Sequence, residues 1–227
     1  MTTSNLDSLV QPERGDISAL YRTMQLSPGT LRFDSWMKAR HDFVLEKGWK
    51  PKTGIEDDFD QYDSNIETAQ FGVYDQSDRL MHGMRLTPIQ GLEQTLSWDM
   101  VQNSTIQDQV KNSGLLDAPY QVWDLTRLVP GEAASMGASY ETIPKLFGDG
   151  LRYCVAQGEE DPLWVFVLDK FMARWLERQG VDILKLGEGK VNDDAHVSTF
   201  GCFRPAELAA DSRSDFAQRA MQMDGIS

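Results

Sequence analysis

Three segments of the sequence carry charged and aromatic side chains in a combination that suits binding of a small polar molecule. The segments are 40–63, 82–89 and 122–130, and their candidate residues are Phe43, Trp49, Asp60, Asp63, Arg85 and Asp124. Carboxylates and aromatic faces attract cations, and arginine forms paired hydrogen bonds with a carboxylate. The set therefore suits a ligand with both cationic groups and a carboxylate. Asp124 could also act as a general base, and backbone N–H groups near Thr126 and Leu128 could stabilise an oxyanion.

The common signatures of nucleotide, hydrolase and metal sites are missing from the sequence. It has no GxxxxGKS or GxxxxGKT loop, no GxGxxG fingerprint and no GxSxG elbow. His41, His82 and His196 lack the i, i+4 spacing of a helical zinc site, so we expect structural or surface roles for them. The acidic run from Asp58 has Asp63 where a calcium loop requires glycine. We expect no bound metal.

Net charge is the compositional feature that most restricts the possible partners. The 227 residues include 22 Lys and Arg against 35 Asp and Glu, a formal net charge of −13. Such a surface repels phosphate backbones and anionic lipid, so we expect no nucleic-acid partner, whereas a small cationic ligand would be attracted. The longest apolar run, residues 163–168, is far shorter than the roughly 20 residues that span a bilayer. Because residues 1–16 lack the features of a secretory signal and there are two cysteines, we expect a cytoplasmic domain without disulfides.

Apolar periodicity and turn residues predict one domain of the α/β (α+β) class. Helices are expected over 31–49, 143–155 and 171–178, and strands over 68–75, 79–89, 121–130, 162–169, 181–187 and 196–205. Residues 90–118 are weakly patterned. This order predicts a mixed, mostly antiparallel sheet flanked by helices on both faces. Residues 1–28 are predicted to be a flexible arm, 29–204 the domain, and 205–227 a loosely attached C-terminal helix and tail.

The order and spacing of the candidate residues resemble those of the acyl-homoserine-lactone synthase family, the bacterial autoinducer synthases. In that family an arginine, a phenylalanine and a tryptophan precede an acid-x-x-acid pair, which RHDFVLEKGW and EDDFDQYD resemble. HGMRLTPI is similar to the family's glycine-x-arginine strand, and VWDLTRLVP to its tryptophan, acid, x, hydroxyl, arginine strand. With a fainter match at LGEGKVNDDAHVSTF, the resemblance covers residues 36–203. Two features differ: Arg40 is one residue closer to Trp49 than in the family pattern, and Asp124 stands where the family usually has glutamate.

The resemblance implies a GNAT-like fold and the synthesis of a quorum-sensing signal from two substrates, S-adenosylmethionine and an acyl thioester on acyl carrier protein or coenzyme A. The amine of S-adenosylmethionine attacks the thioester to give an amide. Its carboxylate then closes the homoserine lactone and expels methylthioadenosine, so no cofactor or metal is required. The family pattern implies that S-adenosylmethionine is bound by Arg40, Phe43, Trp49, Asp60, Asp63 and Arg85. It implies catalytic roles for Asp124, Thr126 and Arg127.

The resemblance also implies how the acyl donor is held. Strict alternation puts Asp124 and Thr126 on one face of a strand and Arg127 on the other, so a β-bulge is implied where two strands separate to admit the thioester arm. The acyl tunnel would be lined by Trp98, Met100, Val167, Leu168, Phe171 and Leu176. Leu168 replaces a threonine that some members associate with 3-oxo chains, which favours an unsubstituted chain.

Docking of an acidic carrier protein would need a basic patch despite the net negative charge. The candidates for this patch are Lys145, Arg152, Lys170, Arg174 and Arg178. The segment GEAASMG has only a loose similarity to the pyrophosphate loop of acetyltransferases. We therefore expect carrier protein as the donor in preference to coenzyme A.

Simpler roles remain open for every candidate residue. The two aromatic residues could be core side chains, the two loop acids could be solvated, Asp124 could form an ion pair with Arg127, and Arg85 could cap a strand. The basic residues could be ordinary solvated charges. Two other functions also remain open: another GNAT-like N-acyltransferase, such as one that acylates an amino acid without forming a lactone, and a catalytically inactive ligand-binding relative.

Overall fold

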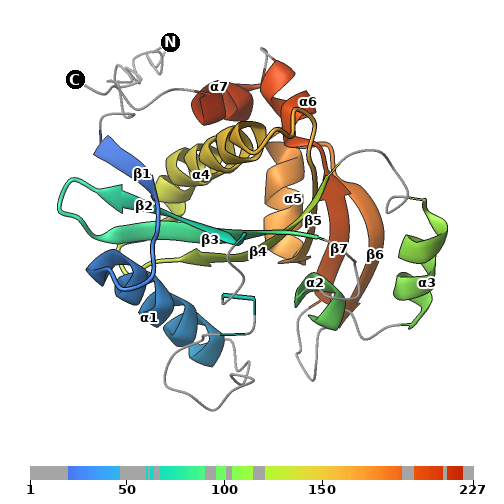
Figure 1. Ribbon diagram of the computed structural model, residues 1–227, viewed down its shortest axis with the longest axis horizontal. Helices are drawn as coiled ribbons and strands as arrows, with labels where there is room; N and C mark the ends of the chain where they lie inside the picture. The colour runs from blue at the N-terminus through green and yellow to red at the C-terminus, as the bar shows by residue number, and fades with distance from the viewer. Residues whose placement is uncertain are drawn as a thin grey trace, which may run out of the picture.

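The strands of the computed structural model form one seven-stranded mixed sheet (Figure 1). They are β1 (Tyr21–Gln25), β2 (Ala69–Asp75), β3 (Leu80–Pro88), β4 (Val122–Pro130), β5 (Leu163–Asp169), β6 (Leu184–Lys190) and β7 (Val197–Phe203). The structure describes residues 20–46, 60, 62–63, 67–89, 96–100, 104–114, 121–190, 197–211 and 214–221. The strand order is β1-β2-β3-β4-β5-β7-β6, and within these residues β4 and β5 are the one parallel pair. The predicted mixed, mostly antiparallel sheet is confirmed.

Helices cover both faces of this sheet, as expected (Figure 1). They are α1 (Leu31–Glu46), α2 (Leu96–Met100), α3 (Ser104–Asn112), α4 (Met136–Ala156), α5 (Lys170–Arg178), α6 (Pro205–Ala210) and α7 (Asp215–Met221). α1 packs on β3 and β4, whereas α4 packs on β2 and β3 from the opposite side. Trp36 of α1 lies against Gly83 of β3, where a Cβ atom would collide with the indole ring. The close packing of α1 against the sheet therefore depends on this glycine.

Two helices differ from the sequence prediction for identifiable reasons. α4 begins seven residues before the predicted start, because the side chain of Ser135 accepts the N–H of Ala138 and caps the helix. Its first turns lack an apolar stripe, so periodicity did not reveal them. In the weakly patterned region 90–118, the described residues form α2 and α3. None of the helices in the described part of the chain has the length and apolar character needed to cross a membrane.

The predicted terminal boundaries are wrong in part, because both ends contribute to the packed domain. Residues 21–25, assigned to a flexible arm, form β1 and pair with β2, while residues 1–19 lie outside the described residues. The predicted loose C-terminal helix is instead α6 and α7, and α7 packs on α4. Phe216 of α7 is buried, and the centroid of its ring lies 5.5 Å from that of Phe147. The ring of Phe147 also contacts those of Trp164 and Phe203. Phe216 therefore joins the aromatic side chains of the main core, and the C-terminal helix is part of that core.

β4 and β5 separate part of the way along their length. Their parallel pairing extends from Val122 with Leu163 to Leu125 with Phe166, and the pairing ends there although both strands continue. On its other edge β4 pairs with β3, and the register shifts so that two residues, Arg127 and Leu128, fall between the Thr126 and Val129 pairs. Arg127 has a φ of +56°, in the left-handed region. The expected bulge is confirmed, and it lies where the two strands diverge.

Candidate functional site

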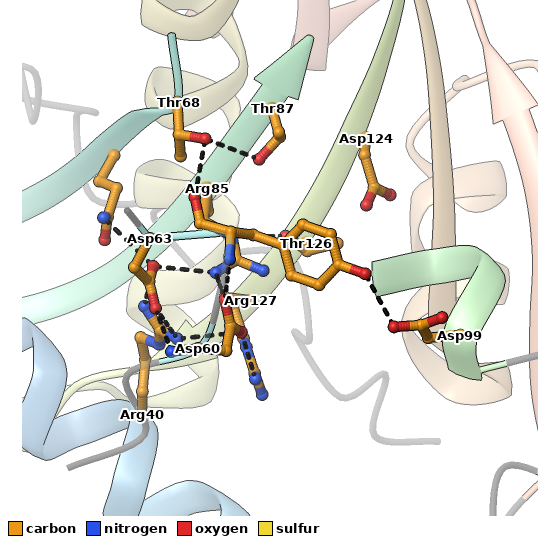
Figure 2. Close-up of polar contacts among 12 residues, drawn as sticks. Arg40, Asp60, Asp63, Thr68, Arg85, Thr87, Asp99, Asp124, Thr126 and Arg127 are labelled. Carbon is orange, nitrogen blue, oxygen red and sulfur yellow. Dashed lines mark hydrogen bonds and ion pairs between the residues drawn. The ribbon is translucent and has the colours of Figure 1, made fainter. Parts of the chain in front are cut away.

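Two buried aspartates and three arginines form one ion-paired cluster on the α1 side of the sheet (Figure 2). Arg85 of β3 is fully buried, and its Nη1 donates to Asp60 Oδ1 at 2.6 Å and to Asp63 Oδ1 at 2.8 Å. Its Nε donates to Thr126 Oγ1 on β4 at 3.0 Å. Nη2 is buried and meets no hydrogen-bond acceptor among the described residues. Arg85 therefore connects the acidic segment to the strand that carries the candidate catalytic residues.

The helix α1 contributes Arg40, which is also fully buried. Its two terminal nitrogens donate to the two carboxylate oxygens of Asp63 at 2.8 and 2.9 Å, a bidentate pair. Asp63 Oδ1 also accepts from Gln70 Nε2 at 3.3 Å, and Gln70 Oε1 in turn accepts from Trp36 Nε1 at 2.6 Å. Arg40 thus reaches the acidic pair despite its one-residue displacement from the family spacing.

Arg127 joins the same cluster because of the bulge. Its Nη2 donates to Asp60 Oδ2 at 2.9 Å, so the side chain lies on the same side of β4 as Thr126. Regular alternation would have sent it to the opposite face. The left-handed backbone at Arg127 therefore allows both side chains to serve one site.

The acids of this cluster are held ionised. Burial alone would raise the pKa of Asp60 and of Asp63. The charge of Arg85 and the hydrogen bonds from the arginines outweigh this, so both pKa values lie below the usual range. Burial lowers the pKa of Arg85, but the two carboxylates raise it further than burial lowers it.

Asp124 lies apart from the cluster, nearer the start of β4 and towards α2 (Figure 2). The residue is 1% exposed, and its Oδ2 accepts the backbone N–H of Ser97 at 3.3 Å. Its Oδ1 meets no donor among the described residues. Burial raises its pKa to about 6, partly opposed by hydrogen bonds from Ser97 and the charge of Arg85. A carboxylate with a pKa near neutrality and an oxygen available for a ligand is suited to accept a proton.

A cavity of about 320 Å³ opens where β4 and β5 diverge. Its walls come from α1, α2, β3, the separated halves of β4 and β5, and the first turns of α4 and α5. The lining residues include Thr126, Arg127, Leu128, Val129, Leu168 and Met172. The cavity is mostly apolar and reaches the cluster through Thr126 and Arg127. It therefore offers space for an extended apolar chain beside the charged groups.

Four of the six residues expected in an acyl tunnel line this cavity: Met100, Val167, Leu168 and Phe171. The other two, Trp98 and Leu176, do not line this cavity. Trp98 packs in a separate cluster with Ile106, Val110 and Phe200. Leu176 faces the main core from the buried side of α5, so a helical turn separates it from the cavity lining.

The residues expected in a basic docking patch do not gather as predicted. Lys145 is 4% exposed within α4, so it cannot contribute to a surface, and Arg152 hydrogen-bonds Asp149 and the carbonyl of Ala220. Arg174 and Arg178 are exposed on α5, and Lys170 forms an ion pair with Glu188 at 2.6 Å. These three lie on the helix whose first residues border the cavity, next to Phe171, which is 75% exposed.

The remaining candidates are Phe43 and Trp49. Phe43 lines the cavity and also packs against the apolar cluster beneath α1. Its position therefore agrees with both roles that the sequence left open, ligand binding and core packing. Trp49 lies outside the described residues. The expectation that Asp60 and Asp63 could be solvated loop acids is wrong, because both are buried.

Tyr62 is a site residue that the sequence patterns did not reveal. Its ring lies 5.5 Å from the guanidinium carbon of Arg85, and its hydroxyl donates to Asp99 Oδ2 of α2 at 2.7 Å. It therefore links the cluster to the helix that covers Asp124. Its position between Asp60 and Asp63 in the acid-x-x-acid pair was the available signal.

Comparisons with known proteins agree with this architecture. No protein-family model and no curated protein sequence matches the chain. Among solved structures it is similar to FeeM, an N-acyl amino acid synthase from uncultured soil microbes, with 12% identity and a TM-score of 0.61 over 87% of this chain and 97% of that chain. It is similar to the AHL synthase LasI, with 15% identity and a TM-score of 0.58 over 81% and 89%. A third is BjaI, a CoA-dependent acyl-homoserine lactone synthase solved with SAM and isopentyl-CoA, with 13% identity and a TM-score of 0.54 over 84% and 87%. At these identities the similarity establishes the fold, which confirms the predicted GNAT-like α/β domain.

Proposed function

We propose that the chain is an N-acyltransferase that moves an acyl group from a thioester to the amine of S-adenosylmethionine, with lactone closure and release of methylthioadenosine. The observation that carries the proposal is the apolar cavity between the separated β4 and β5, which ends beside the arginine cluster on the strand that carries Asp124. An acyl thioester fits the cavity, and a charged acceptor fits the polar groups at its end. The proposed substrates make the cytoplasm the expected compartment.

The charges at the end of the cavity suit an acceptor that is an α-amino acid or contains one. Such an acceptor has an ammonium group next to a carboxylate. The buried Nη2 of Arg85 meets no hydrogen-bond acceptor among the described residues, which favours the carboxylate. Asp124 on the same face of β4 favours the ammonium group, because its Oδ1 is available.

In the proposed reaction Asp124 takes a proton from the acceptor nitrogen, directly or through a water. The neutral amine attacks the thioester carbon, the C–N bond forms, the C–S bond breaks and the thiolate leaves. Thr126 and Arg127 border this point, and backbone N–H groups of the bulged strand are suited to stabilise the oxyanion. For S-adenosylmethionine, the carboxylate oxygen then attacks the γ-carbon, and the carbon–sulfonium bond breaks to release methylthioadenosine.

The loop between β4 and α4 favours a carrier-protein donor over coenzyme A. Three of its N–H groups are already used: Gly131 donates to the carbonyl of Met81 at 2.8 Å, Ala133 to that of Leu80 at 3.2 Å, and Ala134 to that of Gly131 at 3.1 Å. A pyrophosphate would need such groups, and the exposed Glu132 in this loop would repel it. A carrier protein presents only a phosphopantetheine arm here, and the exposed basic residues of α5 are suited to its acidic surface.

A second candidate is N-acylation of an amino acid without lactone formation. The observation that favours it is that both Asp60 and Asp63 are ion-paired with arginines, so neither is available to a sulfonium ion in this arrangement. The similarity of the fold to an N-acyl amino acid synthase agrees with this candidate. The two reactions share the acyl cavity and Asp124 and differ in the acceptor.

Mass spectrometry separates the candidates. Organic extracts of a non-producing bacterium that expresses the chain would be searched for the homoserine-lactone fragment and for N-acyl amino acids, with an Asp124→Asn strain as control. Lactones in the wild-type extract alone support the first reaction, and N-acyl amino acids alone support the second. Binding of S-adenosylmethionine by the purified protein without either product, when acyl carrier protein is supplied, would indicate a ligand-binding relative that has lost activity.

A further inference from the structure

Polar residues of β3 and α4 interrupt the apolar wall of the cavity on the side where α4 lies. His82 of β3 and Ser139 of α4 both line the cavity, and Thr142 lies one helical turn further along α4. His82 is 4% exposed and Thr142 is fully buried. None of the three takes part in the proposed chemistry, and polar side chains are rarely buried without a hydrogen-bonding role.

The hydrogen bonds fix which nitrogen of His82 carries the proton. Thr142 Oγ1 donates to the carbonyl of Ala138 at 2.8 Å, so its own proton is used. It lies 2.8 Å from His82 Nδ1 and must accept from it. Nε2 is therefore the unprotonated nitrogen. Burial lowers the pKa of His82 to about 4, so the ring is neutral at pH 7 and Nε2 stays an acceptor.

Ser139 is a competing partner for Nε2. Its Oγ lies 3.3 Å from Nε2 and 3.1 Å from the carbonyl of Ser135. The hydroxyl has a single proton and cannot serve both acceptors. When it donates to Ser135, Nε2 becomes an acceptor in the cavity wall that a ligand can use, because a buried acceptor without a donor is unfavourable.

The position of His82 indicates which part of a donor would meet it. Arg85 pairs with Thr126 beside the proposed reaction centre, and His82 lies three residues before Arg85 on β3, opposite Pro130. Three residues of a strand span about 10 Å. An extended chain advances about 1.3 Å per bond, so this distance corresponds to roughly eight bonds. In a phosphopantetheine arm, an amide N–H and a hydroxyl lie about that far from the thioester sulfur, whereas a substituent at C3 of the acyl chain lies much closer to the reacting carbonyl.

We propose that His82 is a specificity residue that accepts a hydrogen bond, through Nε2, from the distal amide N–H or the hydroxyl of the donor's pantetheine arm. Ser139 occupies Nε2 when the cavity is empty and turns to Ser135 when the donor is bound, and Thr142 positions the ring. This inference rests on the proposed function in one respect, because that function locates the thioester beside Thr126.

The test measures donor binding by calorimetry without an acceptor, so that no transfer occurs. The probes are the octanoyl thioesters of pantetheine and of N-acetylcysteamine, which lacks the distal amide and hydroxyl, and the N-acetylcysteamine thioester of 8-hydroxyoctanoate. His82→Leu should weaken binding of the pantetheine thioester about tenfold, the loss of one hydrogen bond, and leave both N-acetylcysteamine thioesters unchanged. Ser139→Ala should leave binding of the pantetheine thioester unchanged or make it tighter. Ser77→Ala, in the exposed turn between β2 and β3, is the matched control.

Three results would overturn the inference. The first is that His82→Leu changes the affinity for all probes equally, or for none of them. The second is that His82→Leu weakens binding of the hydroxyoctanoyl probe alone, which would assign the site to the acyl chain. The third is a tenfold weakening in Ser139→Ala, a variant that keeps the buried ring in place. Product formation is measured separately. If the expected binding pattern is found without any N-acyl product, the inference stands and the proposed reaction fails; if product forms without the pattern, the reverse holds.

Discussion

Replacing Asp124 with asparagine should strongly reduce acyl transfer and stabilise the fold at the same time. The side chain is buried, and burial raises its pKa from the usual 3.8 to about 6. Asparagine has nearly the same shape, carries no charge and cannot take a proton from an amine. A positioned general base typically contributes about 10²–10⁴ in rate. We expect kcat to fall by about that factor, with acceptor affinity close to that of the wild type.

The gain in stability has a definite sign and size. A carboxyl group whose pKa is higher in the folded than in the unfolded state favours folding when protonated, so ionising it destabilises the fold. This destabilisation is absent below about pH 3.8, grows up to about pH 6 and is constant above it. A difference of about two pKa units corresponds to about 3 kcal/mol. Asp124→Asn should therefore be more stable than the wild type by up to about 3 kcal/mol at pH 7.5 and by about half as much at pH 5.

Urea unfolding at the two pH values measures the stability, and transfer from octanoyl carrier protein measures the activity. Asp124→Glu is the matched control, because it keeps a carboxylate and should retain more activity than asparagine does. The wild-type rate should fall as pH drops below about 6, and this dependence should vanish in the residual activity of Asp124→Asn. Near-normal turnover of Asp124→Asn would remove Asp124 as the base. A stability difference that does not grow between pH 5 and 7.5 would refute the electrostatic reasoning.

Three further predictions concern packing, the ion-paired cluster and the cavity. Gly148→Ala should destabilise the fold by about 1–3 kcal/mol in urea unfolding, because a Cβ atom there would collide with the carbonyl of Ala220; Gly137→Ala on the same helix has open space and should be neutral or stabilising. Arg85→Met should cost about 3–5 kcal/mol at pH 7 by leaving two buried carboxylates short of a partner. Because the pKa values of both carboxyls lie below 3.8 in the folded wild type, this deficit should shrink as pH falls below about 4, and a constant deficit would contradict the ion-pair account. Val167→Phe should reduce transfer of long acyl chains at least tenfold and spare short ones, because it fills the cavity; equal loss for both chain lengths would place the acyl chain elsewhere.

Local patterns in the sequence were sufficient to predict most of the secondary structure. The hairpin of β2 and β3, the strands β4, β5 and β7, and the helices α1 and α5 match their predicted positions closely, because apolar periodicity and turn residues act over a few neighbouring positions. The prediction was wrong where distant contacts stabilise a segment. β1 is stable because it pairs with β2, and α7 because Phe216 enters the core beside Phe147.

The candidate site divides in the same way. The sequence by itself determined which side chains could do chemistry, since Asp60, Asp63, Arg85 and Asp124 were identified by their residue types, and Arg127 by the resemblance of its segment to a family pattern. Their partners and ionisation states depended on the tertiary structure, which buries the charges and brings residues from α1, β3 and β4 within hydrogen-bond distance.

The tertiary structure alone also decided the direction of Arg127, the burial of Lys145 and the pairing of His82 with Ser139. The physical reason is that residue type and spacing are local properties of the chain. Desolvation, side-chain direction at a bulge and the width of the opening between two strands depend on segments far apart in the sequence.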